Sequence, residues 1–234
     1  MGQQNRGPKR NYKQDFQRVV AELENMILIG AFQPRKRLVE KNLSQIFNVS
    51  RFWIRDALKV LETKGLVKLI PYKGAVVSNV SLQELEEIFV IRVALEKLAT
   101  RLALKNISSS DIKILKRISK QVEQSFMKKD FQNMLIANTN FHDYIFKRSQ
   151  NQTLQQMING LRSRCHIIRH SAWSSPGFLE RSLEEHQLYI NALKGRDLET
   201  LEQLAEDHIT HAKTHYLKKL ANENNSVPLV SSEV

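Results

Sequence analysis

The stretch FNVSRFWIRDALKVLETKGLVKLIPYKGAVV, residues 47–77, constrains the fold more than any other part of the chain. Ser50 is a good helix N-cap, because its hydroxyl can accept a hydrogen bond from a free N–H of the first turn. It predicts a helix from Arg51 to about Lys64, and Gly65 is a typical helix stop. The runs LVKLI and AVVSNV then predict two short strands joined by a turn at residues 71–74.

Two more helices are predicted upstream. Apolar residues at helical spacing run from Phe16 to Ile27, and Gly30 ends that helix. A shorter helical pattern covers residues 43–47, and residues 48–49 make a turn. Helix, short helix, tight turn, helix and hairpin, in this order, are typical of a winged helix-turn-helix, in which the hairpin is the wing.

From residue 81 onward the patterns are helical, and Ser81 with Glu84 predicts a capping box at the start. Six helices are expected, at about residues 81–105, 108–129, 131–148, 151–170, 178–194 and 198–221. The fold class is therefore mainly α. The expected parts are a disordered basic tail at 1–10, a winged helix-turn-helix domain at 11–79, an all-α bundle of about six helices at 80–222, and a flexible tail at 223–234.

The charge of the chain indicates a polyanionic partner. Lysine and arginine number 36 against 24 acidic residues, which gives a net charge of +12. Residues 1–80 hold 15 of the basic residues and 6 of the acidic ones, so the basic surface belongs mainly to the first domain. A single cysteine, Cys165, excludes an intrachain disulfide, and no apolar run of about 18 residues predicts a membrane span. We expect a soluble, cytoplasmic protein.

The helix after Ser50 has the features of a DNA-reading helix. Such a helix lies in the major groove, with its N-terminal residues at bases and phosphates. Arg51 and Arg55 are four apart and share a face, and arginine pairs with guanine through two hydrogen bonds. The alternative is a solvated face of a structural helix. Ile54 belongs to the apolar stripe that predicts the core, whereas Phe52 falls outside it.

Residues 38–78 also resemble the DNA-binding domain of the GntR family of bacterial transcription regulators. The motifs are Leu38-x-Glu40, Val49-Ser50-Arg51, Arg55-Asp56-Ala57-Leu58, Leu61-Glu62 with Gly65-Leu66, and Gly74. The resemblance implies double-stranded operator DNA as partner, with contacts from Lys41, Ser50, Arg51, Phe52, Arg55, Lys73 and Gly74. Two departures are Pro34-Arg35 where the family usually has Pro-Gly, and Phe52 where it usually has a small or hydroxyl residue.

The helical half contains a candidate metal site. Asn138 and His142 are four apart on one helix face, and His186 and His208 lie on two later helices. Three imidazoles with an amide oxygen suit a divalent transition metal, with Zn²⁺ or Ni²⁺ as the leading candidates. Periodicity alone does not bring these residues together. On the last helix, His208 is preferred as the ligand, and the nearby His211 and His215 are expected to be solvated.

Residues 85–215 resemble the FCD ligand-binding domain of the FadR-type branch of the same family. The motifs are Arg92-x-x-x-Glu96, Asn138-x-x-x-His142, Asn151, Glu185-His186 and His208. The resemblance implies a homodimer whose metal is held by Asn138, His142, His186 and His208, beside a small carboxylate or sugar-acid effector. Asn138 departs from the commoner Asp. Arg92 suits an effector carboxylate, and Arg162 and Arg169 are further candidates.

The sequence therefore predicts a ligand-responsive regulator, with repression as the more frequent outcome in the family, on a near-palindromic operator. An effector-only regulator without metal stays open. A metal-dependent hydrolase is a second alternative, because three histidines with an open position can activate water. Against it, the chain has no HExxH motif, nucleophile elbow or phosphate-binding loop. A third alternative is a DNA-architectural protein, which needs no buried polar pocket.

Overall fold

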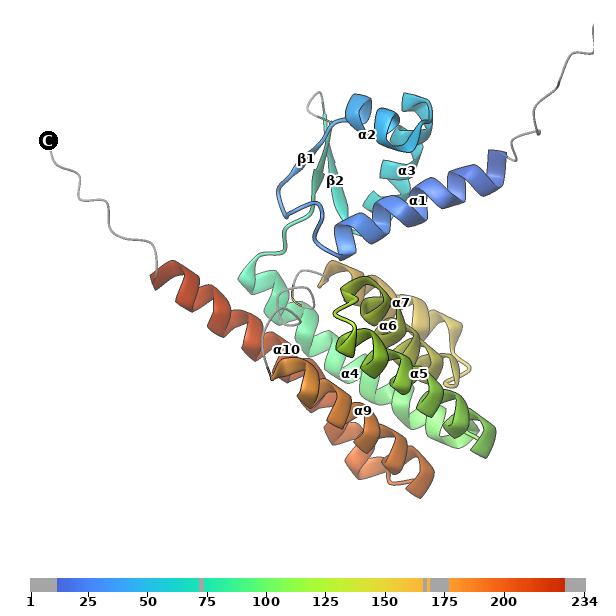
Figure 1. Ribbon diagram of the computed structural model, residues 1–234. Coiled ribbons are helices and arrows are strands. Elements are labelled where there is room, and N and C mark those ends of the chain that lie inside the picture. Colours follow the sequence, from blue (N-terminus) through green and yellow to red (C-terminus); the bar gives the residue numbers. More distant parts are fainter. Residues whose placement is uncertain (1–11, 72–73, 166–167, 169–176, 226–234) are drawn as a thin grey trace, which may run out of the picture. The chain divides into compact units, whose positions relative to one another are not determined.

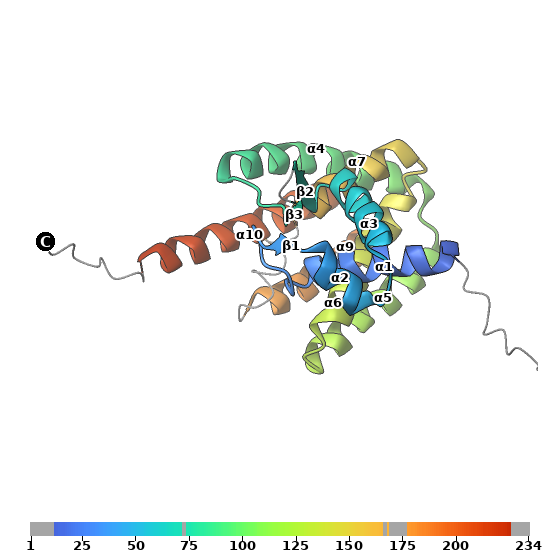
Figure 2. The ribbon, with the colours of Figure 1, turned by 90° about the horizontal axis from the view of Figure 1, so that it is seen from above.

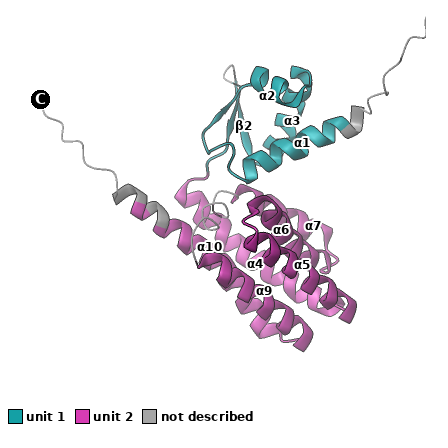
Figure 3. Cartoon of the chain, in the orientation of Figure 1, with its two compact units in different colours: residues 1–79 teal, residues 80–234 magenta. Residues whose placement is uncertain are grey.

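The computed structural model describes residues 12–71, 74–165, 168 and 177–225. The chain divides into two units, residues 1–79 and residues 80–234 (Figure 3). Each unit has its own buried core. No helix within the described ranges is both long and apolar enough to cross a membrane.

The first unit contains three helices and a small sheet (Figure 1). In chain order the elements are α1 (Tyr12–Leu28), β1 (Arg37–Leu38), α2 (Glu40–Phe47), α3 (Arg51–Thr63), β2 (Val67–Ile70) and β3 (Gly74–Val77). The sheet is antiparallel with strand order β1-β3-β2, and Val67 pairs with Val77. The expected helices and wing are confirmed. Strand β1 was not predicted, because two residues carry no alternation of polar and apolar side chains.

The turn between α2 and α3 forms as the sequence predicts. Asn48 adopts the left-handed conformation, with φ of 52°. Ser50 caps α3, and its hydroxyl accepts a hydrogen bond from the Trp53 N–H at 3.5 Å. The stripe that includes Ile54 and Leu58 is buried against α1 and the sheet. The apolar face of α3 therefore fixes the helix, and its opposite face is left for solvent or a partner.

The second unit is built from six described helices, and the prediction of a helical bundle is confirmed. They are α4 (Leu82–Asn106), α5 (Ser109–Met127), α6 (Phe131–Lys147), α7 (Gln152–Arg164), α9 (Phe178–Gly195) and α10 (Leu198–Asn225). Helices α4 and α10 lie side by side (Figures 1 and 2). Helix α7 ends at Arg164, earlier than expected, and Cys165 is its C-cap. Ser81 caps α4, but Glu84 pairs with Arg164 instead of completing the capping box.

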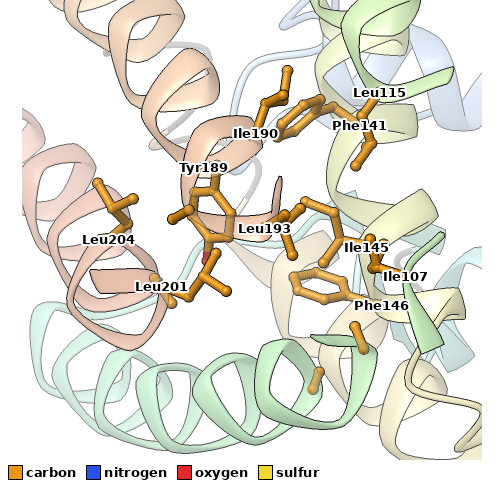
Figure 4. Close-up of a cluster of buried hydrophobic side chains, with 14 of the residues drawn as sticks. Ile107, Leu115, Phe141, Ile145, Phe146, Tyr189, Ile190, Leu193, Leu201 and Leu204 are labelled. Atoms are coloured by element: carbon orange, nitrogen blue, oxygen red, sulfur yellow. The ribbon is translucent and has the colours of Figure 1, made fainter. Parts of the chain in front are cut away.

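The main core of this unit joins helices that are far apart in the sequence. Phe141 of α6, Tyr189 of α9 and Leu201 of α10 belong to one buried cluster (Figure 4). A smaller cluster joins Cys165 to Ile209 of α10 and to the first turns of α4. Burying these side chains drives the helices together. The packing also brings one face each of α6, α9 and α10 toward one another.

Candidate functional site

The start of α3 presents an exposed surface on the first unit. Arg51 and Phe52 are both exposed, and 60% of the Phe52 surface is accessible. Lys41, in the first turn of α2, is exposed as well. At the wing, Gly74 has a φ of +84°, a conformation that favours glycine. Lys73 lies outside the described residues.

Arg55 is held by an ion pair. Its Nε donates to Oε1 of Glu40 at 3.0 Å, and its Nη2 donates to Oε2 at 2.9 Å. The hydrogen bonds from Arg55 lower the pKa of the Glu40 carboxyl. This two-point contact joins the start of α2 to α3 and orients the Arg55 guanidinium. A hydrogen bond from Arg55 to a base would therefore come from a side chain that Glu40 already positions.

Three histidines meet inside the second unit. His142 of α6, His186 of α9 and His208 of α10 each offer a ring nitrogen, and these nitrogens lie within 4.8 Å of one another. The ring centroids are 4.8 Å apart for His142 and His208 and 5.3 Å apart for His142 and His186. His142 and His186 are buried, and the Phe141 ring stacks on His186 at 4.1 Å. Such a group can hold a metal ion.

Burial keeps two of these imidazoles neutral. It lowers the pKa of His142 well below its ordinary value, and Arg162 adds to that effect. It also lowers the pKa of His186 to about 3. Nε2 of His142 and both ring nitrogens of His186 find no hydrogen-bond partner among the described residues. Buried polar atoms without partners are rare, and a neutral imidazole offers a lone pair, so these atoms fit metal coordination.

The cluster borders a small cavity of about 40 Å³. Asn138 lies one helical turn before His142, is buried, and lines the same cavity. Arg92 of α4 and Arg162 of α7 line it too. The packing therefore brings Asn138, His142, His208, Arg92 and Arg162 to one cavity, beside His186. Arg169 lies outside the described residues.

Both cavity arginines are buried beside carboxylates. Arg92 pairs with Glu96 at 2.9 Å, and both side chains are at most 12% exposed. Burial disfavours the charged guanidinium, but Glu96 and Cys165 outweigh this and raise the pKa of Arg92. Arg162 contacts Asp143 at 3.3 Å, and burial lowers its pKa. The cavity thus combines neutral donor groups with two arginines that are each paired with a carboxylate.

Two residues beside the cluster were missed or misjudged from the sequence. Glu185 forms hydrogen bonds with His208 at 2.6 Å and with His211 at 2.7 Å. The expectation that His211 is solvated is therefore wrong, because α9 covers that side of α10 and supplies Glu185. His215 is half-buried, with its ring against that of Phe178 at 5.4 Å. The available signal was the position of Glu185 directly before His186.

The winged helix-turn-helix of the first unit is the architecture of a DNA-binding protein. Comparison with known proteins identifies the family. Residues 16–77 match the family described as "Bacterial regulatory proteins, gntR family". Residues 87–211 match the family described as "FCD domain". The chain belongs to the GntR family of regulators and carries a C-terminal FCD domain, which confirms both resemblances.

The relatives of this chain are regulators, and the matches cover most of the length of both proteins. The uncharacterised HTH-type transcriptional regulator YdhC of Bacillus subtilis is 28% identical over 203 residues, covering 86% of this chain and 90% of that one. The HTH-type transcriptional regulator McbR of Escherichia coli is 30% identical over 180 residues, covering 76% of this chain and 81% of that one. The solved structure "E. coli McbR/YncC" has a TM-score of 0.79 at 26% identity, covering 88% of this chain and 98% of that one.

A third relative is the gluconate operon transcriptional repressor of Bacillus licheniformis. It is 28% identical over 186 residues, covering 77% of this chain and 76% of that one. These relatives are transcriptional regulators. The chain is accordingly a DNA-binding transcriptional regulator and not an enzyme, and the hydrolase alternative is dropped.

Proposed function

We propose that this regulator binds a near-palindromic operator as a homodimer, and that a small organic acid bound beside a divalent metal ion in the second unit controls this binding. One observation carries the proposal. Two of the three clustered histidines, His142 and His208, line one cavity together with Arg92 and Arg162, in the unit that does not contain the winged helix-turn-helix. The donors suit a metal ion, and the guanidinium groups suit the carboxylate of an effector.

The proposed metal ligands are His142, His186, His208 and Asn138. Imidazole nitrogens favour borderline ions, so Zn²⁺ or Ni²⁺ is the expected occupant. Asn138 would add a carbonyl oxygen from the helical turn next to His142. When bound, the ion would supply a positive charge that attracts a carboxylate. The chain's own contribution is a rigid set of donors on three packed helices.

Charge balance supports an anionic effector. The four donor groups carry no formal charge when the imidazoles are neutral. Arg92 and Arg162 already lie beside Glu96 and Asp143, and Glu185 beside His208 adds one further negative charge. A doubly charged ion would leave buried positive charge in excess, which is costly unless an anion offsets it. Arg92 lines the same cavity as Asn138, His142 and His208, so it could help to hold a carboxylate there. Metal and acid should therefore bind more tightly together than either binds alone.

The size of the cavity suggests how the acid could act on the protein. A volume of about 40 Å³ is small beside the cavity of about 150 Å³ that holds a benzene molecule in another protein. An acid with several carbon atoms would have to move lining side chains, and with them the helices that carry these side chains. Such an acid would bind two arrangements of the bundle unequally and so shift their populations.

On the DNA side, we propose that the exposed start of α3 reads the operator. Arg51 can pair with the O6 and N7 atoms of guanine, and Phe52 can contact a thymine methyl group. Arg55, oriented by Glu40, can reach an adjacent base or phosphate. Lys41 and the capped N-terminus at Ser50 suit phosphate oxygens. Lys73 and Gly74 at the wing would add contacts with the DNA backbone.

An exposed apolar stripe on α4 supports the dimer. Val90, Ile91 and Leu98 are 71%, 48% and 41% exposed, and the exposed Ala94 lies between them on the same helix face. Monomeric soluble proteins rarely leave such stripes uncovered. A second copy of this chain would cover both stripes at once and pair two heads with two half-sites. The regulator would act in the cytoplasm, where the DNA lies.

Repression is the proposed outcome, because the gluconate operon relative is named as a repressor. That relative also makes sugar acids sensible first effectors to test. Metal content tests the site itself. Wild-type protein loaded with Zn²⁺ or Ni²⁺ should retain one ion per chain, and joint replacement of His142 and His186 by Ala should abolish it. His215→Ala is the matched control, because it removes a histidine of α10 outside the cluster. Full metal content in the double variant would refute the site.

A screen of organic acids on metal-loaded and metal-free protein completes this test. We expect carboxylates and sugar acids to raise the melting temperature more strongly when the metal is present. Equal stabilisation with and without metal would instead support an effector-only regulator. No response to any acid in either form would contradict the proposed effector class.

A further inference from the structure

Glu185 lies at the centre of a hydrogen-bond network beside the histidine cluster. It is in the middle of α9, is 7% exposed, and directly precedes His186. Its Oε2 lies 2.6 Å from Nδ1 of His208, and its Oε1 lies 2.7 Å from Nδ1 of His211. Arg181, one turn earlier, contacts Oε1 at 3.3 Å. One carboxylate therefore binds two histidines of the neighbouring helix α10.

The carboxylate of Glu185 determines the direction of these bonds. Arg181 and His211 contact Oε1, His208 contacts Oε2, and the Arg181 guanidinium can only donate. An ionised carboxylate only accepts hydrogen bonds, so Nδ1 of each histidine must donate. A neutral imidazole has a single N–H. In a neutral His208 that N–H therefore lies on Nδ1, and the lone pair lies on Nε2.

His211 has the same tautomer but a different environment. Its Nε2 lies 2.6 Å from Nη2 of Arg181, which can only donate. The lone pair of His211 is therefore already used by Arg181. His211 also lies outside the group whose nitrogens converge, whereas His208 belongs to it. Of the two histidines that Glu185 binds, only His208 combines an available lone pair with a place in the cluster.

We propose that Glu185 is the positioning residue of the metal site. It acts through His208 by fixing the ring orientation, by holding the N–H on Nδ1, and by increasing the basicity of Nε2. This inference rests on the proposed function, because it assumes that the cluster binds a metal ion. Carboxylate–histidine pairs of this kind commonly strengthen metal binding, and their loss typically weakens it about 10- to 100-fold.

The direct test is the affinity of the cluster for Ni²⁺ or Zn²⁺, measured by competition with a chromophoric chelator. Glu185→Gln should weaken binding by about 10- to 100-fold, because the amide is uncharged and its oxygen can serve only one of the two histidines. Glu185→Ala should weaken it at least as much. Glu184→Gln is the matched control, since it removes the same charge from an exposed neighbour on α9. Wild-type affinity in Glu185→Gln would overturn the inference.

A second measurement separates positioning from folding. In metal-free protein, ¹H–¹⁵N correlations of the histidine rings report which nitrogen carries the proton. His208 should be protonated at Nδ1 in the wild type and should populate the other tautomer in Glu185→Gln. The melting temperature of the metal-free variants checks that the bundle is intact. A wild-type His208 with its single proton on Nε2 would overturn the inference, whatever the metal affinity.

The outcomes also distinguish this inference from the function on which it rests. If the wild type binds neither ion, the proposed metal site fails, and the role of Glu185 fails with it. If the wild type binds metal and the Glu185 variants bind it equally well, only the role of Glu185 fails. If His211→Gln loses metal as completely as His208→Gln, then His211 is a ligand, and the assignment of roles on α10 is overturned.

Discussion

Acidification should destabilise the second unit because two of its histidines are held neutral. Burial lowers the pKa of His186 to about 3 and places that of His142 well below its ordinary value. In the unfolded chain both titrate near pH 6.5. Between these values the unfolded chain binds more protons than the folded chain, so stability is lost as the pH falls below about 6.5.

The size of the effect follows from the same pKa values. For one histidine that stays neutral in the fold, a change from about pH 7.5 to about pH 5.5 lowers the free energy of unfolding by about 1.4 kcal/mol. For the two histidines together, the free energy of unfolding should therefore fall by about 3 kcal/mol over this change of pH. Glu185 contributes little here. Its pKa is about 2 in the fold and near 4.5 for an unperturbed glutamate, so its stabilisation is constant across this window.

Urea unfolding of metal-free protein, followed by far-ultraviolet circular dichroism at both pH values, measures the effect. The matched variant is His186→Leu, which removes one of the two buried titrating groups and keeps an apolar environment. Its loss of stability should be smaller than that of the wild type by about 1.4 kcal/mol. The comparison cancels the titrating groups that both proteins share and that lie away from residue 186. An equal loss in wild type and variant would refute the reasoning.

Three further predictions concern the cavity and the dimer. Asn138→Asp should tighten Ni²⁺ or Zn²⁺ binding about tenfold or more, since a carboxylate adds a charged ligand. It should also make metal binding depend less on the organic-acid effector. An unchanged metal affinity would argue against Asn138 as a ligand. Arg92→Ala should shift the acid dose response of the melting temperature to higher concentration by about tenfold or more, because a bidentate contact is lost, and an unaltered response would exclude Arg92. Leu98→Glu should give a monomer in analytical ultracentrifugation, with unchanged helicity; a dimer as tight as the wild type would place the interface elsewhere.

The fold could be predicted closely because local patterns and packing agree. Ser50 carries a cap signal that forms, and the stripe through Ile54 is the face that is buried. Two features went beyond the sequence patterns. Strand β1 exists only because β3 offers it a partner. Helix α7 ends at Arg164, where Cys165 turns into the small cluster with Ile209.

The site was harder to predict, because its members come from different helices. Spacing places Asn138 and His142 on one face, but their meeting with His186 and His208 depends on how α6, α9 and α10 pack. The family resemblance supplied that grouping. It did not supply the role of Glu185, because the contacts of that carboxylate with His208 and His211 depend on how α9 packs against α10. Nor could spacing indicate that Arg55 is bound by Glu40, which lies 15 residues earlier.

Operator affinity in the presence and absence of the ligands tests the central claim most directly. The operator would first be selected from genomic DNA with the purified protein. It would then be titrated with metal-free wild-type protein, and with wild-type protein loaded with Ni²⁺ or Zn²⁺ and the acid that stabilises it most. Occupancy of the cavity should change the affinity for this operator about fivefold or more, the range expected of an allosteric coupling. Arg92→Ala should bind the operator normally but lose that response. Unchanged operator affinity with metal and acid demonstrably bound would contradict the account.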